Sequence, residues 1–474
     1  MTQKTTEPAV EDGARGKEPA GRAVGRPLDR VDGKAKTTGA ARFVAEFAYP
    51  DLAHAALVHS TVARGRITRI DTAAAAALPG VIAVLTHENA PKLKPPRQPN
   101  VLRDFGPSVS GTQVNYLNTD EVYWDGQPVA IVVAETSAAA REAARLVEVT
   151  YQEMPSAVDF AALEKTATPA KGDMLFRGSA KKGDAEAALA AAPVSVDLRY
   201  TTPPLQQNAI EPHATIADWE GDRLTLHDCT QYIEAACAYI AQRFAVPRAN
   251  VRLIAPFVGG GFGGKFNVWP GTILTALAAR VVGRPVRLEL TRQGVNRTVG
   301  GRTATTHRIA LGADTDGRLS AIVHTCVTRV GRTGGWLEQT TSPTRHLYDA
   351  ANLLTQQNVV ELDLLPNSWL RGPGEAPGTF VLESAMDELA YKLGMDPIEL
   401  RMHNEPDVDP IDGTPFSQRM LREAFALGAE RFGWSQRTPE PRSLRDGRWL
   451  VGMGVATAFH TAVRVTADVA VHLA

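Results

Sequence analysis

The chain has 474 residues, 44% of them hydrophobic, which is enough to bury several large cores. Its 51 Lys and Arg residues balance 52 Asp and Glu residues, so the charge gives no reason to expect nucleic acid or an anionic membrane as a partner. No stretch approaches the roughly 20 apolar residues that a membrane span needs. Three cysteines are too few to hold an iron–sulphur cluster, and they are expected to be buried free thiols.

The first elements along the chain predict a small α/β domain. Residues 1–24 are polar and charged and are expected to be a disordered leader with no apolar signal core, which favours a cytoplasmic location. From Pro50 to about Tyr151, short apolar runs alternate with alanine-rich helical stretches. The clearest unit is a buried strand over 128–134, a helix from Thr136 or Ser137 through Leu146, and a second strand over 147–151.

The rest of the chain mixes strands and helices, so the fold class is α+β. Residues 160–192 show no sustained pattern and are interpreted as a connector. Alternating apolar residues then predict a strand over 194–200, and further strands are expected at 215–219, 224–227, 251–258 and 286–290. Helices are predicted over 378–393 and from Pro397, with Asp396 as N-cap. Residues 449–474 predict the strand-rich beginning of another domain.

The most informative segment is the glycine-rich run from Gly259 to Lys265, which holds five glycines in six positions. Bare backbone N–H groups in such a run can closely approach a phosphate or an oxo ligand. The run nearly matches a P-loop, but Phe266 stands where Ser or Thr would bind magnesium. It also fits the GxGxxG pattern of a nicotinamide-dependent dehydrogenase, although Pro270 falls in the expected helix. A turn that only permits close packing is the third interpretation.

Two other segments carry polar residues that suit a site. Arg371 lies on a loop of glycines and prolines directly before a predicted helix, where a held cation suits a negatively charged group. A surface arginine on a tight turn is the simpler interpretation of the same residue. The second segment contains Glu211 and His213 and is followed by Gln231. Glu211 or His213 is a candidate base or ligand. A histidine in this setting is more often a hydrogen-bonded structural residue. No cluster with metal-ligand spacing is found, so no protein-held metal is expected.

Taken together and in order, these segments resemble the molybdenum-binding subunit of the xanthine dehydrogenase and aldehyde oxidase family, closest to bacterial three-subunit enzymes. The resemblance covers residues 25 to 474. It rests on matching motifs in order along the chain: Gly25-Arg26-Pro27, Asp32-Gly33, Thr38-Gly39, Gly126–Ala130, Glu211-Pro212-His213, Thr230-Gln231, Gly259–Lys265, Arg371–Gly374, Glu383 with Asp387–Ala390, and Asp396–Arg401.

The resemblance implies a domain order and a cofactor site. A hammerhead-like α/β domain would occupy residues 25–165, a connector residues 166–190 and the first molybdopterin-binding domain residues 191–435. Residues 436–474 would be the incomplete start of a second such domain. The implied cofactor is molybdenum-molybdopterin in its cytosine dinucleotide form, and Phe266 and His460 would line the substrate pocket. The residues that would contact the cofactor are Gln231, Gly260, Gly261, Phe262, Gly263 and Arg371.

The implied reaction is the oxidation of aldehydes to carboxylic acids by water-derived hydroxylation. Electrons would pass to 2Fe-2S clusters and FAD on partner subunits, and an exported partner is the one route by which this chain would reach the periplasm. The family's catalytic glutamate is expected beyond residue 474, so the chain is expected to be inactive alone. Phe266 replaces a glutamate that xanthine enzymes use, which favours aldehydes over purines. A non-catalytic remnant or assembly partner that keeps the fold is the alternative.

Overall fold

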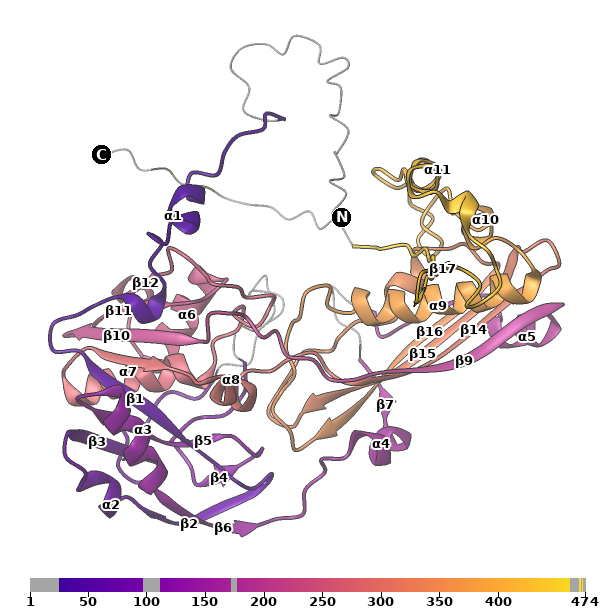
Figure 1. The fold of residues 1–474 in the computed structure, drawn as a ribbon. Helices are drawn as coiled ribbons and strands as arrows, with labels where there is room; N and C mark the ends of the chain where they lie inside the picture. The colour runs from indigo at the N-terminus through magenta and orange to yellow at the C-terminus, as the bar shows by residue number, and fades with distance from the viewer. Residues whose placement is uncertain (1–24, 97–110, 172–176, 461–468, 470, 472–474) are drawn as a thin grey trace. The chain divides into compact units, whose positions relative to one another are not determined.

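The computed structural model describes residues 25–96, 111–171 and 177–460, together with residues 469 and 471 (Figure 1). Two compact units are distinguished, Met1–Arg42 and Phe43–Ala474. The expected leader at residues 1–24 lies outside the described residues. In the first unit, helix α1 (Gly33–Thr37) is preceded by Asp32, whose carboxylate lies 2.5 Å from the Lys36 ammonium. All further elements belong to the second unit.

A seven-stranded mixed sheet dominates the first half of the second unit (Figure 1). Its central contact is a parallel pair in which Ala53 lies opposite Val286, and it joins strands far apart in sequence. In spatial order the strands are β12 (Val251–Ile254), β11 (Arg223–Asp228), β10 (Ala214–Glu220), β13 (Val286–Glu289), β1 (Ala53–His59), β5 (Pro128–Ala134) and β3 (Val81–Thr86).

Helices cover this sheet because each presents an apolar face to it. Helix α7 (Pro270–Val282) is buried over most of its length and packs on β10 and β13, while α6 (Ile233–Phe244) packs beside β12. Helix α3 (Ser137–Leu146) packs on β1 and β5, and the Thr136 side chain accepts a hydrogen bond of 3.1 Å from the Ala139 amide at its start. The predictions for strand 128–134 and for this capped helix are confirmed.

A smaller sheet lies beside α3 and completes the N-terminal part of the second unit. Its strands, in spatial order, are β4 (Glu121–Val122), β2 (Gly65–Asp71) and β6 (Glu148–Glu153). Three further short helices are α2 (Ala73–Ala76), α8 (Arg292–Thr298) and α4 (Phe160–Leu163), the last of which contacts β16. Single turns of 3-10 helix are found at Val44–Glu46, Glu164–Thr166, Arg248–Asn250, Pro343–Arg345 and Trp434–Gln436.

A six-stranded sheet forms the second half of the unit. Helix α9 (Glu375–Leu393) packs on the face that carries Ile309 and Leu311, and α5 (Ala185–Ala191) packs on the opposite face, which carries Ala310. The strands are β7 (Thr168–Pro169), β16 (Asn352–Leu362), β15 (Leu319–Gly331), β14 (Thr305–Ala313) and β9 (Val194–Thr202), with β8 (Ser179–Lys182) also paired to β16.

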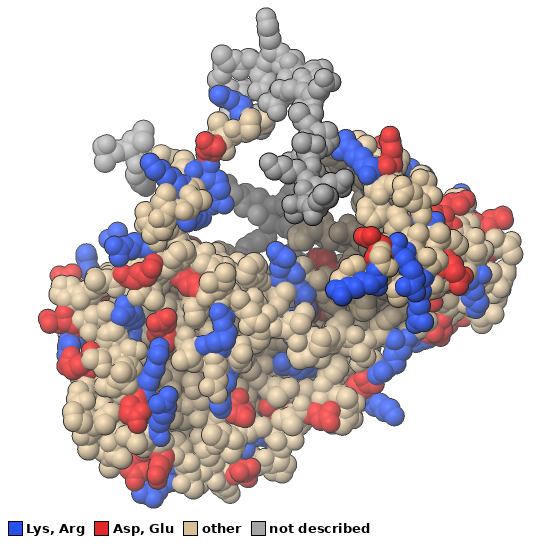
Figure 2. Space-filling view, viewed as in Figure 1, with Lys and Arg blue, Asp and Glu red and all other residues tan. Residues whose placement is uncertain are grey.

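The last described elements are α10 (Pro397–His403), α11 (Leu421–Phe432) and a short hairpin of β17 (Arg445–Asp446) and β18 (Trp449–Leu450). Asp396 caps α10 through its side chain, as predicted. Figure 2 shows acidic and basic side chains interspersed over the visible face, in keeping with the balanced composition. In the part of the chain that the structure describes, no helix combines the length and the hydropathy needed to span a membrane.

Four sequence expectations need correction. The strand expected over 251–258 ends at Ile254, and the helix expected from Gly378 begins at Glu375, because Pro377 fits the first turn, where no amide donor is needed. The connector expected over 160–192 is wrong for four stretches, which form α4, β7, β8 and the Asp184-capped α5, and its residues 172–176 lie outside the described residues. The expectation of strands after residue 449 is wrong for residues 451–460, which form no strand. The Thr457 amide there donates to the Glu383 carboxylate at 2.7 Å and not to a neighbouring strand.

Candidate cofactor-binding site

The glycine turn, residues Gly259–Lys265, is glycine-rich because other chain segments press against it. Gly260 and Gly263 have φ values of +92° and +100°, which side chains rarely adopt. A Cβ on Gly263 would lie 2.6 Å from the Trp369 carbonyl oxygen, and one on Gly261 would lie 2.3 Å from Oε1 of Gln231. Phe262 itself adopts φ +52°. Close packing therefore accounts for part of the glycine content.

The turn nevertheless leaves hydrogen-bond donors available. Its first amide, of Gly259, donates to Glu211 at 2.7 Å, and the Gly263 amide donates to Oε1 of Gln231 at 3.1 Å. Between them, the amides of Gly260, Gly261 and Phe262 donate to no acceptor in the described part of the chain. Successive bare amides in a turn with positive φ values form a concave surface that suits an anionic oxygen.

A buried ion pair supports the turn from below. The Lys265 ammonium lies 2.6 Å from Oε2 of Glu211, and its side chain is fully buried. The same oxygen accepts the Gly259 amide, so one carboxylate joins both ends of the turn. Glu211 was a candidate base or ligand on sequence grounds, and the structure shows it serving the turn.

Gln231 and Arg371 both lie at the glycine turn, although they are distant from it in sequence. The Arg371 amide donates to the Phe262 carbonyl at 2.9 Å, and its guanidinium carbon lies 5.8 Å from the Phe262 ring centroid. The Gln231 amide donates to the Lys265 carbonyl at 2.8 Å. Both side chains and the Phe262 ring are exposed, so this face is accessible. The juxtaposition of these three residues, expected from the resemblance, is confirmed.

A second buried ion pair, not found from the sequence, holds the Arg371 loop. Arg302 Nε lies 2.8 Å from Oε1 of Glu338, and its Nη2 donates to the carbonyls of Leu370, Arg371 and Gly372 at 2.6, 2.9 and 3.0 Å. Glu338 in turn accepts the Gly374 amide at 3.1 Å. A fork of guanidinium donors that engages several carbonyls fixes the loop geometry. No local sequence signal marks either residue, because their partners lie far along the chain.

His213 is a structural residue in this arrangement. Its Nε2 lies 3.2 Å from the Gly264 carbonyl, and complete burial, with Lys265 nearby, lowers its pKa to about 3. The ring is therefore neutral at physiological pH and donates to that carbonyl. This agrees with the interpretation of His213 as a hydrogen-bonded structural residue, and not with its interpretation as a base or a ligand.

Phe266 lies in a row of aromatic side chains that we call the aromatic cluster: Tyr232, Phe266, Trp369 and Trp336. The Phe266 ring centroid is 5.0 Å from that of Tyr232 and 5.7 Å from that of Trp369. Trp369 stacks on Trp336 at 4.0 Å. His460 is exposed and follows Phe459, which stacks on His346 at 5.1 Å beside the α9 core. Its place in a substrate pocket stays a prediction.

The two nucleotide-binding interpretations are wrong for this geometry. A P-loop or a dinucleotide fold leads directly from the glycine turn into a helix whose N-terminus faces the phosphates. Here α7 begins only at Pro270, and the Gly264 carbonyl is bonded by the Trp269 indole at 2.8 Å. The preceding strand β12 lies at the edge of a mixed sheet, not at the centre of a doubly wound one.

Solved structures share this architecture. The aldehyde oxidoreductase of Desulfovibrio gigas matches with a TM-score of 0.71 and 25% identity, over 86% of this chain and 47% of that chain. Quinoline 2-oxidoreductase of Pseudomonas putida 86 matches in fold with a TM-score of 0.74 and 24% identity, over 86% of this chain and 54% of that chain.

Curated relatives extend the likeness to sequence. The chain is 40% identical over 455 residues to the aldehyde oxidoreductase molybdenum-binding subunit of Escherichia coli (strain K12), covering 95% of this chain and 60% of that protein. It is 29% identical over 446 residues to the xanthine dehydrogenase molybdenum-binding subunit of Escherichia coli O157:H7, covering 91% of this chain and 59% of that protein. The chain thus spans about 60% of the length of these relatives.

Two family models match consecutive parts of the chain. Residues 38–155 match the aldehyde oxidase and xanthine dehydrogenase a/b hammerhead domain, and residues 168–405 match the molybdopterin cofactor-binding domain. The second match covers half of the chain and contains the glycine turn, Gln231 and Arg371. This chain is a member of the aldehyde oxidase and xanthine dehydrogenase family of molybdopterin-binding proteins.

Proposed function

We propose that this chain forms the cofactor-binding face of a molybdenum hydroxylase that oxidises aldehydes to carboxylic acids. The observation that carries the proposal is the convergence of Arg371, Gln231 and three bare amides at the glycine turn. The 40% identity to an aldehyde oxidoreductase subunit supports the choice of reaction. We further propose that partner subunits carry FAD and 2Fe-2S clusters and that the cofactor is the cytosine dinucleotide form.

The donors present fit the group that the family implies. A pterin cofactor with phosphate and oxo oxygens offers acceptors, and the face offers backbone amides, a side-chain amide and a guanidinium. The bare amides of Gly260, Gly261 and Phe262 would hold it as backbone donors, and Gly263, whose own amide donates to Gln231, would border it. Gln231 and Arg371 would contact it through their side chains. When bound, the cofactor supplies the two-electron oxidation and the oxygen transfer. Arg371 would place a positive charge beside the bound cofactor, and the exposed Phe262 ring would cover part of it.

The aromatic cluster supports an aldehyde substrate. Phe266 and its ring neighbours Tyr232 and Trp369 form an apolar, half-buried wall directly after the glycine turn. Such a wall packs against an aromatic or aliphatic body but provides no carboxylate to hold the polar edge of a purine. A site that lacks the required hydrogen-bond partner discriminates against such a substrate by orders of magnitude.

The experiment compares molybdenum content and turnover in matched variants of the full chain, produced with its partner subunits in a host that makes the cofactor. Arg371→Gln removes the cation at the glycine turn, while Arg223→Gln removes an exposed arginine on β11. Metal analysis is expected to show several-fold less molybdenum in Arg371→Gln and no change in Arg223→Gln. When the family's catalytic glutamate is supplied as well, the wild-type complex should reduce a dye with benzaldehyde and not with xanthine. Equal loading of both variants would overturn the site, and absence of any turnover would favour the non-catalytic alternative.

A further inference from the structure

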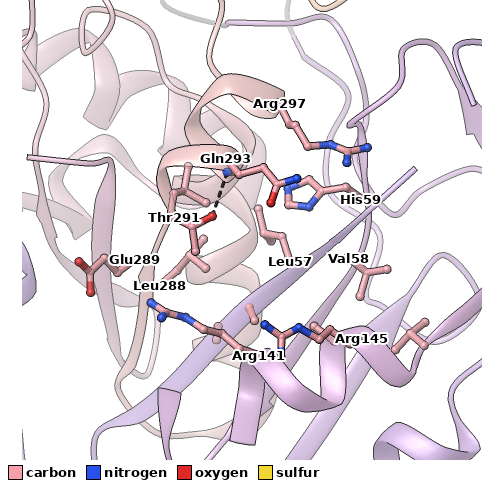
Figure 3. A pocket seen from close by; sticks show the side chains of 16 residues that line it. Leu57, Val58, His59, Arg141, Arg145, Leu288, Glu289, Thr291, Gln293 and Arg297 are labelled. Carbon is pink, nitrogen blue, oxygen red and sulfur yellow. Dashed lines mark hydrogen bonds between the residues drawn. The ribbon is translucent and has the colours of Figure 1, made fainter. Parts of the chain in front are cut away.

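A cavity lies where helix α3 faces strand β13 and helix α8, and its lining does not include the glycine turn (Figure 3). It has a volume of about 370 Å³, within the range of small-molecule sites. Strands β1 and β13 run parallel from Ala53 to Ala55, after which β13 ends at Glu289 while β1 continues to His59. The cavity therefore lies at the carboxyl end of a parallel pair where the strands separate, which is where open α/β sheets bind ligands.

The charged groups that line this cavity are mainly cationic. Arg141, Arg145 and Arg297 contribute to the lining, against the single carboxylate of Glu289. Figure 3 shows Arg141 and Arg145 extending from α3 along the same wall, with Glu289 turned away from them. Arg145 has an exposed partner in Glu142 at 3.0 Å, whereas Arg141 has no carboxylate partner among the described residues. An excess of arginines favours an anionic occupant.

Two buried nitrogen atoms in the cavity wall also lack partners in the described part of the chain. Arg297 uses Nη2 for the Ser60 carbonyl and Asp125, at 2.6 and 2.5 Å, but its buried Nε has no hydrogen-bond partner in the described chain. The buried Nε2 of His59 likewise has none. Because buried polar atoms are normally satisfied, each such atom indicates a missing partner. In Figure 3 the Gln293 side chain lies beside the His59 ring, adding a third polar group to the same end.

Other parts of the cavity wall are apolar, which favours an anion that carries an apolar body. Val58, Ala144 and Val147 are apolar residues that line the cavity beside the arginines of α3. We propose that this cavity binds a small organic anion, a carboxylate or a phosphate monoester with an apolar body, at a site separate from the glycine turn. The anionic head accepts hydrogen bonds from Arg141 and Arg145, while the apolar body packs against Val58, Ala144 and Val147. The site does not depend on the proposed reaction.

Calorimetric titration of the full chain tests this proposal with three probes that share a ring: benzoate, phenyl phosphate and benzamide. Benzoate and phenyl phosphate distinguish the two sources of the anion, and neutral benzamide measures what the ring contributes alone. At least one anion should bind about tenfold more tightly than benzamide, as expected for hydrogen bonds to a charged group. Equal binding of benzamide, or no binding of either anion at millimolar concentration, overturns the proposal.

Matched variants locate the binding. Arg141→Gln combined with Arg145→Gln changes two exposed positions of α3 to another good helix former, and should raise the dissociation constant of the anion about tenfold or more. Arg223→Gln, away from the cavity, and Arg371→Gln, at the glycine turn, should leave it unchanged. Binding lost in Arg371→Gln and kept in the double variant would assign the anion to the glycine turn, refuting this proposal while supporting the proposed function. Equal weakening in Arg223→Gln would indicate a general charge effect and also refute it.

Discussion

Lys265 shows what a single residue contributes to the site. A lysine is rarely buried fully unless its charge is paired, and here the pairing partner, Glu211, also accepts an amide of the same turn. The ion pair therefore fixes where the two ends of the glycine turn lie relative to each other. The bare amides between them are positioned by it, although neither charge reaches the exposed face.

Breaking this pair from one side should be costly. Lys265→Met leaves the Glu211 carboxylate buried without a counter-charge, and is expected to lower the free energy of unfolding by about 3–5 kcal/mol. The double variant Lys265→Met, Glu211→Gln should recover part of that loss. Urea unfolding of the wild type, both single variants and the double variant measures the coupling.

An exposed pair provides the control for that measurement. Lys182 lies 3.2 Å from Asp349, with 40% and 57% of the two side chains exposed. Lys182→Met should cost less than about 1 kcal/mol. A similar loss in both lysine variants would mean that burial of the Lys265 pair has no energetic role.

At the scale of elements, the glycine turn depends on conformations and clearances that alanine cannot meet. Gly263→Ala would add a Cβ 2.6 Å from the Trp369 carbonyl at φ +100°, whereas Gly221→Ala meets no atom within 4 Å at φ +59°. The Gly221 variant should lose about 1 kcal/mol from backbone strain alone. The Gly263 variant should lose about two to three times as much. Thermal unfolding of both variants separates strain from clash, and equal losses would contradict the close packing against Trp369.

The same scale shows which elements the sequence could reveal. Strand 128–134 and the helix capped by Thr136 were predictable because their signals, an apolar run and an N-cap, are local. Strand β8 was not, because the polar segment 179–182 becomes a strand only by pairing with β16 more than 150 residues later. Arg371 could be recognised as a candidate from its loop, but its clamp by Arg302 and Glu338 depends on tertiary contacts that no local pattern reports.

At the scale of the whole molecule, buried histidines link stability to pH. Complete burial lowers the pKa of His213 to about 3, and burial likewise lowers the pKa of His307 to about 3. An unfolded histidine titrates near 6.5, so between pH 6.5 and 3 the unfolded chain binds protons that these rings do not. Their contribution is complete above pH 6.5 and is lost as the pH falls. Buried Asp228, whose pKa burial raises to about 6, acts in the opposite sense between about pH 4 and 6.

The expected acid sensitivity is about 1.4 kcal/mol per pH unit for each of the two histidines between pH 6 and 4. The substitution His307→Gln should reduce the dependence of the unfolding free energy on pH by the contribution of one histidine, about 1.4 kcal/mol per pH unit. This expectation is independent of the effect of the substitution on stability at pH 7. Urea unfolding free energies measured at half-unit pH intervals give the slopes. An unchanged slope in the His307 variant would show that this ring does not stay neutral in the folded chain.

The parallel pairing of β1 with β13 sets an order of events during synthesis. Strand β1 can pair with β5 once residue 134 has left the ribosome, but its other edge has no partner until residue 289 emerges. At about 5–20 residues per second, that edge waits on the order of 10–30 s in the nascent chain. An open strand edge is a template for intermolecular pairing. Nascent chains halted between these two points should therefore be the ones that recruit a ribosome-associated chaperone, and those halted after β13 should release it.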